Sequence, residues 1–261
     1  MLSAFLTRTL LCRILGPVRS WRYHRQMRRA FWQTTDQDRR MMAFYEPFVR
    51  AGDLVFDVGA NVGNRTKIFS LLGARVVAVE PQPPCAEDLR IVCRGRDGIR
   101  IVGCALGRES GEADMLVSGS STVSSLSACW IESVTKSQRL SGVLWDRTLR
   151  VPVRTLDSLI GEFGVPRFVK VDVEGYEAEV IQGLSRPLPA LSLEFTPEFP
   201  AAIESCIERL SAMGEPEFQI SLGESMEFWL TAWVGTGEIL DRLRSVPPTA
   251  FGDLYVRFSA A

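Results

Sequence analysis

The chain has 261 residues, 46% of them hydrophobic and 23% charged, values typical of a globular protein with one α/β domain and an appendage. The formal net charge of −1 excludes a global attraction to nucleic acid or to an anionic membrane. The six cysteines include no C-x-x-C pair, which excludes a zinc site or a disulfide framework of the usual spacing and predicts reduced thiols in the cytoplasm.

The first 37 residues are interpreted as a basic N-terminal helical extension in front of a domain at 38–261. No acidic residue occurs before Asp36, whereas arginine is frequent, and the stretch 2–15 is too short and too charged to cross a bilayer. Three roles stay open for this arm: a solvated helix packed on the domain, a helix lying peripherally on a membrane, and an organelle transit peptide. The only histidine, His24, lies in this arm, so a general base in the domain must be another residue type.

The first half of the domain alternates between strands and helices. The strands are predicted from apolar runs that are almost unbroken, as in strands buried on both faces. The elements are a helix at 38–49, a strand at 54–58, a helix at 65–72, a strand at 75–80, a helix at 84–94 and a strand at 99–104. This order predicts a Rossmann-like α/β fold, a mostly parallel sheet with helices on both faces.

The alternation is interrupted between residues 111 and 154. A hairpin of two strands, 111–118 and 150–154, is expected to enclose a serine-rich segment, 118–141, which has no clear period and is interpreted as an irregular lid or substrate loop. Trp130 and Trp145 lie in or near this segment, where they either stack on a sugar or anchor the loop.

The regular pattern then returns to the end of the chain. We expect a helix at 155–163 with Asp157 as its N-cap, strands at 168–172 and 191–195, helices at 176–184 and 201–213, and late strands at 218–221, 227–231 and 254–258 that are partly antiparallel.

The clearest functional motif is Asp57-Val58-Gly59-Ala60-Asn61-Val62-Gly63, which follows the first strand and opens the next helix. Its two glycines allow a sharp turn and a close approach of the backbone to a ligand. Glu80 ends the second strand, where nucleotide-binding folds place a carboxylate for ribose hydroxyls. Asp57 would repel a pyrophosphate but suits the ammonium of a methionine moiety, so the motif favours S-adenosylmethionine over NAD. The alternatives are that the glycine turn has a purely structural role and that Glu80 is a surface residue that caps a turn.

A second acidic cluster, Asp172 and Glu174, follows the strand at 168–172. The alternation of side chains places both acids on one side, at the edge where open α/β sheets bind ligands. We predict that one of them accepts or orients the proton of a substrate hydroxyl, which requires a pKa raised by burial. The alternatives are structural, with Glu174 capping a helix and Asp172 paired with Lys170. No metal is assigned, although Mg²⁺ binding by the two acids stays open. Glu194, at the same edge, is expected to shape the acceptor pocket or to have a structural role.

The ordered segments FDVGANVGNRT, VVAVEPQP, VRTLDSLI, VKVDVEGYEAEVIQGL and LSLEF resemble the FkbM family of methyltransferases. The resemblance spans roughly 53–195 and is weaker on to 258. It implies a seven-stranded sheet whose last-formed pair is antiparallel, S-adenosylmethionine bound over the C-terminal ends of the strands, and methylation of a hydroxyl on a small molecule, sugar or glycolipid. It also implies the cofactor-binding residues: Asp57, Gly59, Asn61 and Gly63, with Ala60 in the same turn, around the methionine part, Glu80 at the ribose, and the backbone of Cys104 and Ala105 facing the adenine.

Two other function classes stay open. The missing third glycine and the presence of Asp57 argue against an NAD-dependent oxidoreductase. The intact pair of Asp57 and Glu80 argues against a non-catalytic binding or scaffold protein. Nucleic acid is not expected as the acceptor, because the basic arm is separate from the strand ends and no Asn/Asp-Pro-Pro-aromatic element follows the fourth long strand.

Overall fold

The computed structural model describes residues 17–247 and 249–258. The expectations for stretch 2–15 therefore lie outside the described residues. Within the described ranges, no helix combines the length and the apolar character needed to span a bilayer.

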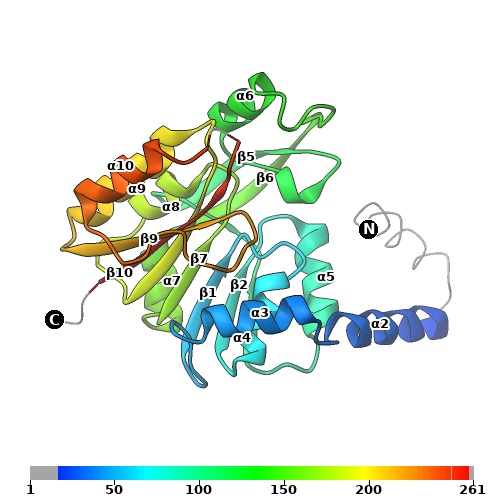
Figure 1. The fold of residues 1–261 in the computed structure, drawn as a ribbon. Helices are drawn as coiled ribbons and strands as arrows, with labels where there is room; N and C mark the ends of the chain where they lie inside the picture. The colour runs from blue at the N-terminus through cyan, green and yellow to red at the C-terminus, as the bar shows by residue number, and fades with distance from the viewer. Residues whose placement is uncertain (1–16, 248, 259–261) are drawn as a thin grey trace.

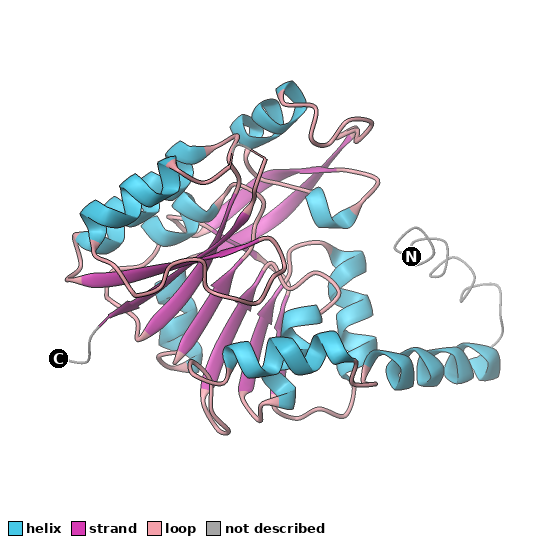
Figure 2. Ribbon diagram, viewed as in Figure 1, coloured by secondary structure: helices cyan, strands magenta, loops and turns pink. Residues whose placement is uncertain are grey.

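A seven-stranded sheet forms the centre of the domain, in the order β3-β2-β1-β7-β8-β10-β9 (Figures 1 and 2). Its strands are β1 (Leu54–Val58), β2 (Arg75–Val79), β3 (Ile99–Val102), β7 (Phe168–Val171), β8 (Ala190–Phe195), β9 (Pro216–Leu222) and β10 (Gly252–Phe258). β1 is parallel to β2 and β7, whereas β10 is antiparallel to β8 and β9. Every position of β1 and β7 is buried, which explains their apolar sequences. The Rossmann-like fold with a mostly parallel seven-stranded sheet is confirmed.

Helices cover both faces of this sheet (Figure 2). They are α3 (Asp36–Tyr45), α4 (Asn64–Leu71), α5 (Pro83–Cys93), α7 (Leu156–Phe163), α8 (Glu177–Gln182), α9 (Pro200–Ser211) and α10 (Thr236–Arg244), and a further helix, α2 (Pro17–Phe31), precedes them. The buried residues of α3, α4 and α5 share one apolar core with the sheet, and those of α7, α8, α9 and α10 share the other. At the start of α7, the side chain of Thr155 accepts the capping hydrogen bond from the Ser158 N–H. The expectation of Asp157 as the cap is therefore wrong, because the cap lies two residues earlier.

The helix α2 projects from the body of the domain (Figure 1). Its C-terminal end is fixed by Trp32, whose Nε1 donates a hydrogen bond of 2.8 Å to the carbonyl of Val92 at the end of α5. The guanidinium of Arg96 lies 3.9 Å from the centre of the Trp32 ring. The extension thus continues directly from the surface of the domain.

A small second sheet, in the order β4-β6-β5, stands beside the main one. It consists of β4 (Ala105–Leu106), β5 (Gly111–Val117) and β6 (Arg147–Arg154), and its antiparallel β5–β6 pair is the predicted hairpin. The segment between these strands contains a short 3-10 helix, η1 (Ser121–Val123), and the helix α6 (Ala128–Lys136). The expectation of an irregular segment at 118–141 is therefore wrong for α6, which is capped by Ser127 and buries Trp130 and Val134, one turn apart.

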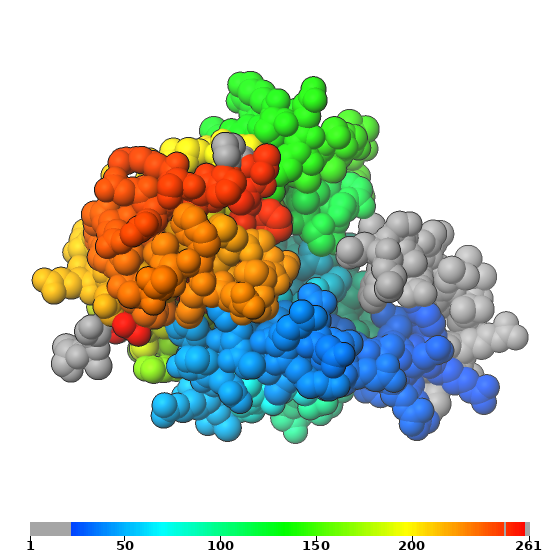
Figure 3. All heavy atoms as spheres, viewed as in Figure 1, coloured from blue at the N-terminus to red at the C-terminus, as the bar shows by residue number. Residues whose placement is uncertain are grey.

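The residues between β9 and α10, 223–235, are called the strap. The expected strand at 227–231 is wrong, because the side chain of Gln219 takes the place of a strand ladder: its Nε2 donates to the carbonyls of Leu230 and Ala232, and its Oε1 accepts from the Leu230 N–H. The ring of Phe228 packs on Phe44 of α3, with 5.0 Å between the ring centres. The strap therefore lies directly against α3 (orange and blue in Figure 3).

Candidate functional site

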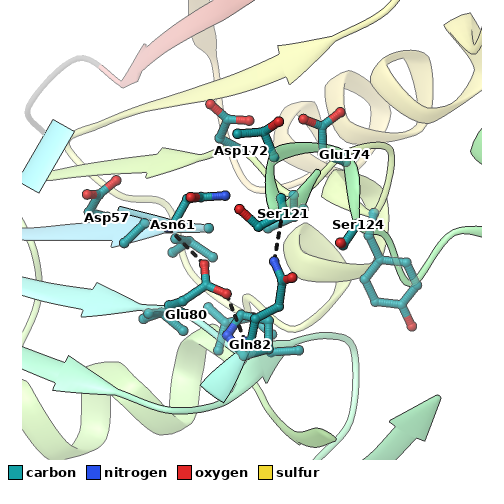
Figure 4. A pocket seen from close by; sticks show the side chains of 18 of the residues that line it. Asp57, Asn61, Glu80, Gln82, Ser121, Ser124, Asp172 and Glu174 are labelled. Carbon is teal, nitrogen blue, oxygen red and sulfur yellow. Dashed lines mark hydrogen bonds between the residues drawn. The ribbon is translucent and has the colours of Figure 1, made fainter. Parts of the chain in front are cut away.

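A cavity of about 300 Å³ opens at the C-terminal ends of β1, β2, β7 and β8. It lies at the edge where open α/β sheets bind ligands, and its volume is at the lower end of small-molecule sites. The sequence-predicted residues that line it are Asp57, Gly59, Ala60, Asn61, Glu80, Cys104, Ala105, Asp172, Glu174 and Glu194. Figure 4 shows the side chains of Glu80 and Gln82 on one side of the cavity and those of Asp172 and Glu174 on the other, with Asn61 between them.

The turn after β1 brings the backbone close to two neighbouring elements. Gly59, Asn61 and Gly63 all have left-handed backbone conformations, with φ of 81°, 47° and 91°. A Cβ on Gly59 would collide with the carbonyl oxygen of Asp172, and a Cβ on Gly63 with the side chain of Leu89 in α5. Gly63 does not line the cavity, so its contact serves the packing of α4 on α5, whereas Gly59 lines the cavity wall.

Asp57 is 2% exposed and is held by Thr66 of α4, whose Oγ1 donates a hydrogen bond of 2.5 Å to Oδ2. Burial raises the pKa of Asp57 to about 6, against the lowering effect of this hydrogen bond and of Lys170. A cationic group beside Asp57 would favour its ionised form. The position therefore suits an ammonium ligand.

Glu80 is 2% exposed and accepts two backbone hydrogen bonds of 2.8 Å, from the Asn61 N–H to Oε2 and from the Gln82 N–H to Oε1. Burial raises the pKa of Glu80 to about 7 in spite of these bonds. A carboxylate has about four acceptor positions, so about two stay available for ribose hydroxyls. Beside it, Oδ1 of Asn61 is buried without a hydrogen-bond partner in the described part of the chain. These acceptors fit the nucleoside part of S-adenosylmethionine.

Three carboxylates, of Asp172, Glu174 and Glu194, each place an oxygen within 4.8 Å of the others. Lys170, which is 1% exposed, donates to Asp172 Oδ2 at 3.1 Å and to Asp253 Oδ1 at 2.8 Å. Oε2 of Glu194 is buried without a hydrogen-bond partner among the described residues. The cluster therefore joins β7, β8 and β10 through one buried cation.

The acids of this cluster differ in pKa. Burial alone would raise the pKa of Asp172, but the charge of Lys170 and its hydrogen bond lower it below the ordinary value. Burial and then the charge of Asp172 raise the pKa of both Glu174 and Glu194 well above the ordinary value. The raised pKa expected of a base is therefore found in Glu174, and the same expectation is wrong for Asp172, because Lys170 neutralises it.

Of the two structural alternatives considered for these acids, pairing with Lys170 holds for Asp172, whereas helix capping does not hold for Glu174. Asp172 does pair with Lys170. Glu174 does not cap the next helix, because the N-cap of α8 is Tyr176 and no side chain makes the capping hydrogen bond there. Glu177 Oε1 instead accepts the N–H groups of Val173 and Gly175 in the loop before α8. Glu174 has a left-handed backbone, with φ of 55°. A non-glycine residue in that conformation is uncommon and often marks a functional position.

The loop that carries Glu174 is held by the segment between β5 and β6. Ser125 Oγ donates a hydrogen bond of 2.6 Å to the carbonyl of Glu174. A Cβ on Gly175 would collide with Trp130 of α6. Trp130 is buried and its Nε1 donates to Thr196 Oγ1 at 3.2 Å, while Trp145 Nε1 donates to the Val123 carbonyl at 2.7 Å. Both tryptophans anchor the segment, and neither lines the cavity.

Several lining residues were not among the predicted site residues. The serine-rich segment contributes hydroxyl groups, and Gln82 Nε2 donates to the Ser121 carbonyl at 3.0 Å. The only signal for these residues is the composition of the segment. Arg65 and Glu224 also line the cavity and form an ion pair of 2.6 Å across 159 residues, a separation that no local pattern predicts.

A protein family and a curated protein match parts of the chain. The family model described as "Methyltransferase FkbM domain" matches residues 57–231. Ribosomal RNA large subunit methyltransferase E of Archaeoglobus fulgidus is 38% identical over 61 residues, which are 20% of this chain and 32% of that protein. The match thus spans about a third of the length of this curated relative.

Two solved structures are similar to the fold. Precorrin-6Y C5,15-methyltransferase of Geobacter metallireducens has a TM-score of 0.44 and 9% identity, covering 84% of this chain and 86% of that one. Fibrillarin of Aeropyrum pernix, solved with natively bound S-adenosyl-L-methionine, has a TM-score of 0.41 and 12% identity, covering 80% of this chain and 68% of that one.

Proposed function

The chain belongs to the FkbM family of methyltransferases, and from this premise we propose that it methylates a hydroxyl oxygen of a small molecule, sugar or glycolipid. The family fixes the reaction class, methyl transfer, and the cofactor, S-adenosylmethionine. It also removes the oxidoreductase alternative. The acceptor atom and the roles of individual residues are the proposal. It rests on one observation: a buried ribose-type carboxylate and a group of acids with unequal proton affinities face each other across one cavity.

The nucleoside and amino acid parts of the cofactor are assigned to the residues that follow β1, β2 and β3. The free acceptor positions of Glu80 would receive the ribose hydroxyls, and the backbone at Cys104 and Ala105 would face the adenine. Asp57 and the turn around Asn61 would hold the methionine part. The cofactor, when bound, supplies a methyl group activated by its sulfonium.

The proton of the acceptor hydroxyl is assigned to Glu174, because burial and the charge of Asp172 raise its pKa, whereas Lys170 lowers the pKa of Asp172. Asp172, kept ionised by Lys170, would orient the hydroxyl. Glu194 would complete the wall of the acceptor pocket. Such positioning can contribute about 7–11 kcal/mol, whereas a general base adds about 10²–10⁴-fold. We therefore expect positioning to supply the larger part of the rate acceleration.

The test is methyl transfer from labelled S-adenosylmethionine by the full chain. The acceptor panel contains free sugars, glycolipids, small hydroxylated molecules, amines and ribosomal RNA. The RNA is included because the curated relative acts on RNA. Mass spectrometry and NMR of the labelled product identify the methylated atom. A methyl ether on a small molecule or glycan supports the proposal. Methylated nitrogen, methylated carbon or methylated RNA as the only product contradicts it.

A further inference from the structure

The cavity is strongly acidic, with one basic residue in its wall. Within the described part of the chain, six carboxylates line it and Arg65 is the only lysine or arginine that does so. The methionine part of the cofactor carries both an ammonium and a carboxylate. A carboxylate entering among six acids needs a cation, since like charges at short range are destabilising. Arg65 is therefore the residue whose charge requires an explanation.

Arg65 is built into the wall of the cavity. Its side chain is 14% exposed, and Nη1 contacts the sulfur of Met41 at 2.9 Å. Nη2 donates to Glu224 Oε2 at 2.6 Å, whereas Nε is buried with no partner in the described residues. Of the five N–H donors of this guanidinium, the described residues therefore engage only two.

The partner of Arg65, Glu224, is much more exposed to solvent than Arg65 itself. Glu224 belongs to the strap, and its side chain is 56% exposed. It follows Gly223, whose φ is 54°, in the turn that starts the strap. An ion pair with an exposed partner stabilises the fold little, typically by about 0–1 kcal/mol. A carboxylate from a ligand can therefore replace Glu224 at small cost.

The position of Arg65 also matches the amino acid end of the cofactor. It lies in the first turn of α4, which follows directly after the turn from Asp57 to Gly63. It lines the same cavity as Asp57 and Asp172, and its charge lowers the pKa of both acids. A cation beside Asp57 supplies the second half of a site for a zwitterion.

We propose that Arg65 binds the carboxylate of the methionine part of S-adenosylmethionine, and that Glu224 occupies this position until the cofactor displaces it. The inference rests on the cofactor placement given under the proposed function. A guanidinium binds carboxylates with two parallel hydrogen bonds, which lysine cannot reproduce. The strap is thereby linked to cofactor binding through one ion pair.

The test measures binding by calorimetry with three ligands. S-adenosylhomocysteine carries the carboxylate and the ammonium, its decarboxylated analogue keeps only the ammonium, and 5′-methylthioadenosine has neither group. Arg65→Met is expected to weaken binding of S-adenosylhomocysteine by about 10- to 100-fold, because a hydrogen bond to a charged group is lost. The two other ligands are expected to bind within about twofold of wild type, and Arg65→Lys to give an intermediate loss.

The second arm removes the competing carboxylate. Glu224→Gln is expected to tighten binding of S-adenosylhomocysteine by about two- to fivefold, because the weak ion pair no longer has to be broken. Binding of 5′-methylthioadenosine should not change. The matched controls are Arg242→Met and Glu238→Gln, which break an exposed ion pair of 2.7 Å on α10 and line no part of the cavity.

Two results overturn the inference. The first is that Arg65→Met weakens the binding of all three ligands equally, or that it leaves their binding unchanged and raises only the KM of the acceptor. The second is an unchanged or weaker affinity for S-adenosylhomocysteine in Glu224→Gln. If wild type binds neither S-adenosylhomocysteine nor 5′-methylthioadenosine, the cofactor placement itself fails, and that result is distinct from failure of the Arg65 assignment alone.

Discussion

Replacing Glu80 by glutamine is expected to raise stability at alkaline pH and to weaken cofactor binding. The pKa of Glu80 is raised from 4.5 to about 7 by burial. A folded-state pKa above the unfolded value contributes stability below pH 4.5, and this stability is lost as the pH rises through 7. At 1.36 kcal/mol per pH unit, the loss amounts to roughly 3 kcal/mol of the free energy of unfolding.

Glutamine resembles the neutral form of this side chain and does not titrate. At pH 5 Glu80→Gln is expected to be less stable than the wild type by up to about 2 kcal/mol, because one backbone N–H faces the glutamine NH₂ at every pH. At pH 8 the variant is expected to be the more stable protein, by up to roughly 3 kcal/mol. In the variant, the backbone N–H of Asn61 or of Gln82 faces the glutamine NH₂ instead of an oxygen. This contact reduces the gain in the free energy of unfolding at pH 8 by about 1–3 kcal/mol.

The assay is urea unfolding of both proteins at several pH values from 5 to 8, combined with calorimetry of S-adenosylhomocysteine at each pH. The variant is expected to bind at least about tenfold more weakly at pH 8, since it loses a charged acceptor for the ribose hydroxyls. Wild-type affinity should rise with pH through 7, because hydroxyl donors favour the ionised carboxylate. Glu112→Gln, on the exposed edge of β5, is the control. Parallel pH profiles of stability for wild type and Glu80→Gln would refute the reasoning.

The remaining predictions concern the turn, the buried lysine and the acidic cluster. Gly59→Ala is expected to abolish binding of S-adenosylhomocysteine in calorimetry, because its Cβ meets the carbonyl of Asp172 at a left-handed φ; Gly111→Ala, where nothing lies within 4 Å, should bind normally. Lys170→Met is expected to lower the free energy of urea unfolding by about 3–5 kcal/mol, because it leaves buried carboxylates without their cation, and a change under 1 kcal/mol would contradict this. Glu174→Gln is expected to lower kcat by about 10²–10⁴-fold with unchanged affinity for S-adenosylhomocysteine, and Asp172→Asn to lower it less; equal losses would contradict the assignment of Glu174 as the base.

The sheet and the side of the cavity formed by Asp57 and Glu80 were predictable because their signals are local in the sequence. The apolar run of β1, the glycine turn and the acid at the end of β2 lie within one β-α-β unit, where chain geometry fixes their relation. The opposite side of the cavity was predicted less completely. Asp172, Glu174 and Glu194 were placed at the right edge, but the difference in their pKa values depends on Lys170, which no local pattern pairs with Asp172 alone: its second partner, Asp253, lies 83 residues away.

Elements that depend on tertiary contacts were predicted wrongly or missed. The residues 227–231 have the composition of a strand, yet the side chain of Gln219 binds both backbone groups of Leu230, and among these described residues only the Trp229 N–H donates to the backbone of β9, at Ile220. The helix α6 was not predicted, because the segment around it is rich in serine and threonine. It is stabilised by the burial of Trp130 against the loop of Glu174. Arg65 and Glu224 meet only because the strap returns across α3.

The contact between α6 and the loop of Glu174 has a consequence for how such an enzyme changes its acceptor. The serine-rich segment lines the cavity, and the same segment presses Trp130 against Gly175 and holds the Glu174 carbonyl through Ser125. If Glu174 is the base, as proposed, acceptor recognition and proton removal therefore depend on the same segment. Replacing this segment by that of a relative would therefore alter acceptor selectivity and turnover together. A replacement segment that changes selectivity would also have to supply contacts that hold the loop of Glu174.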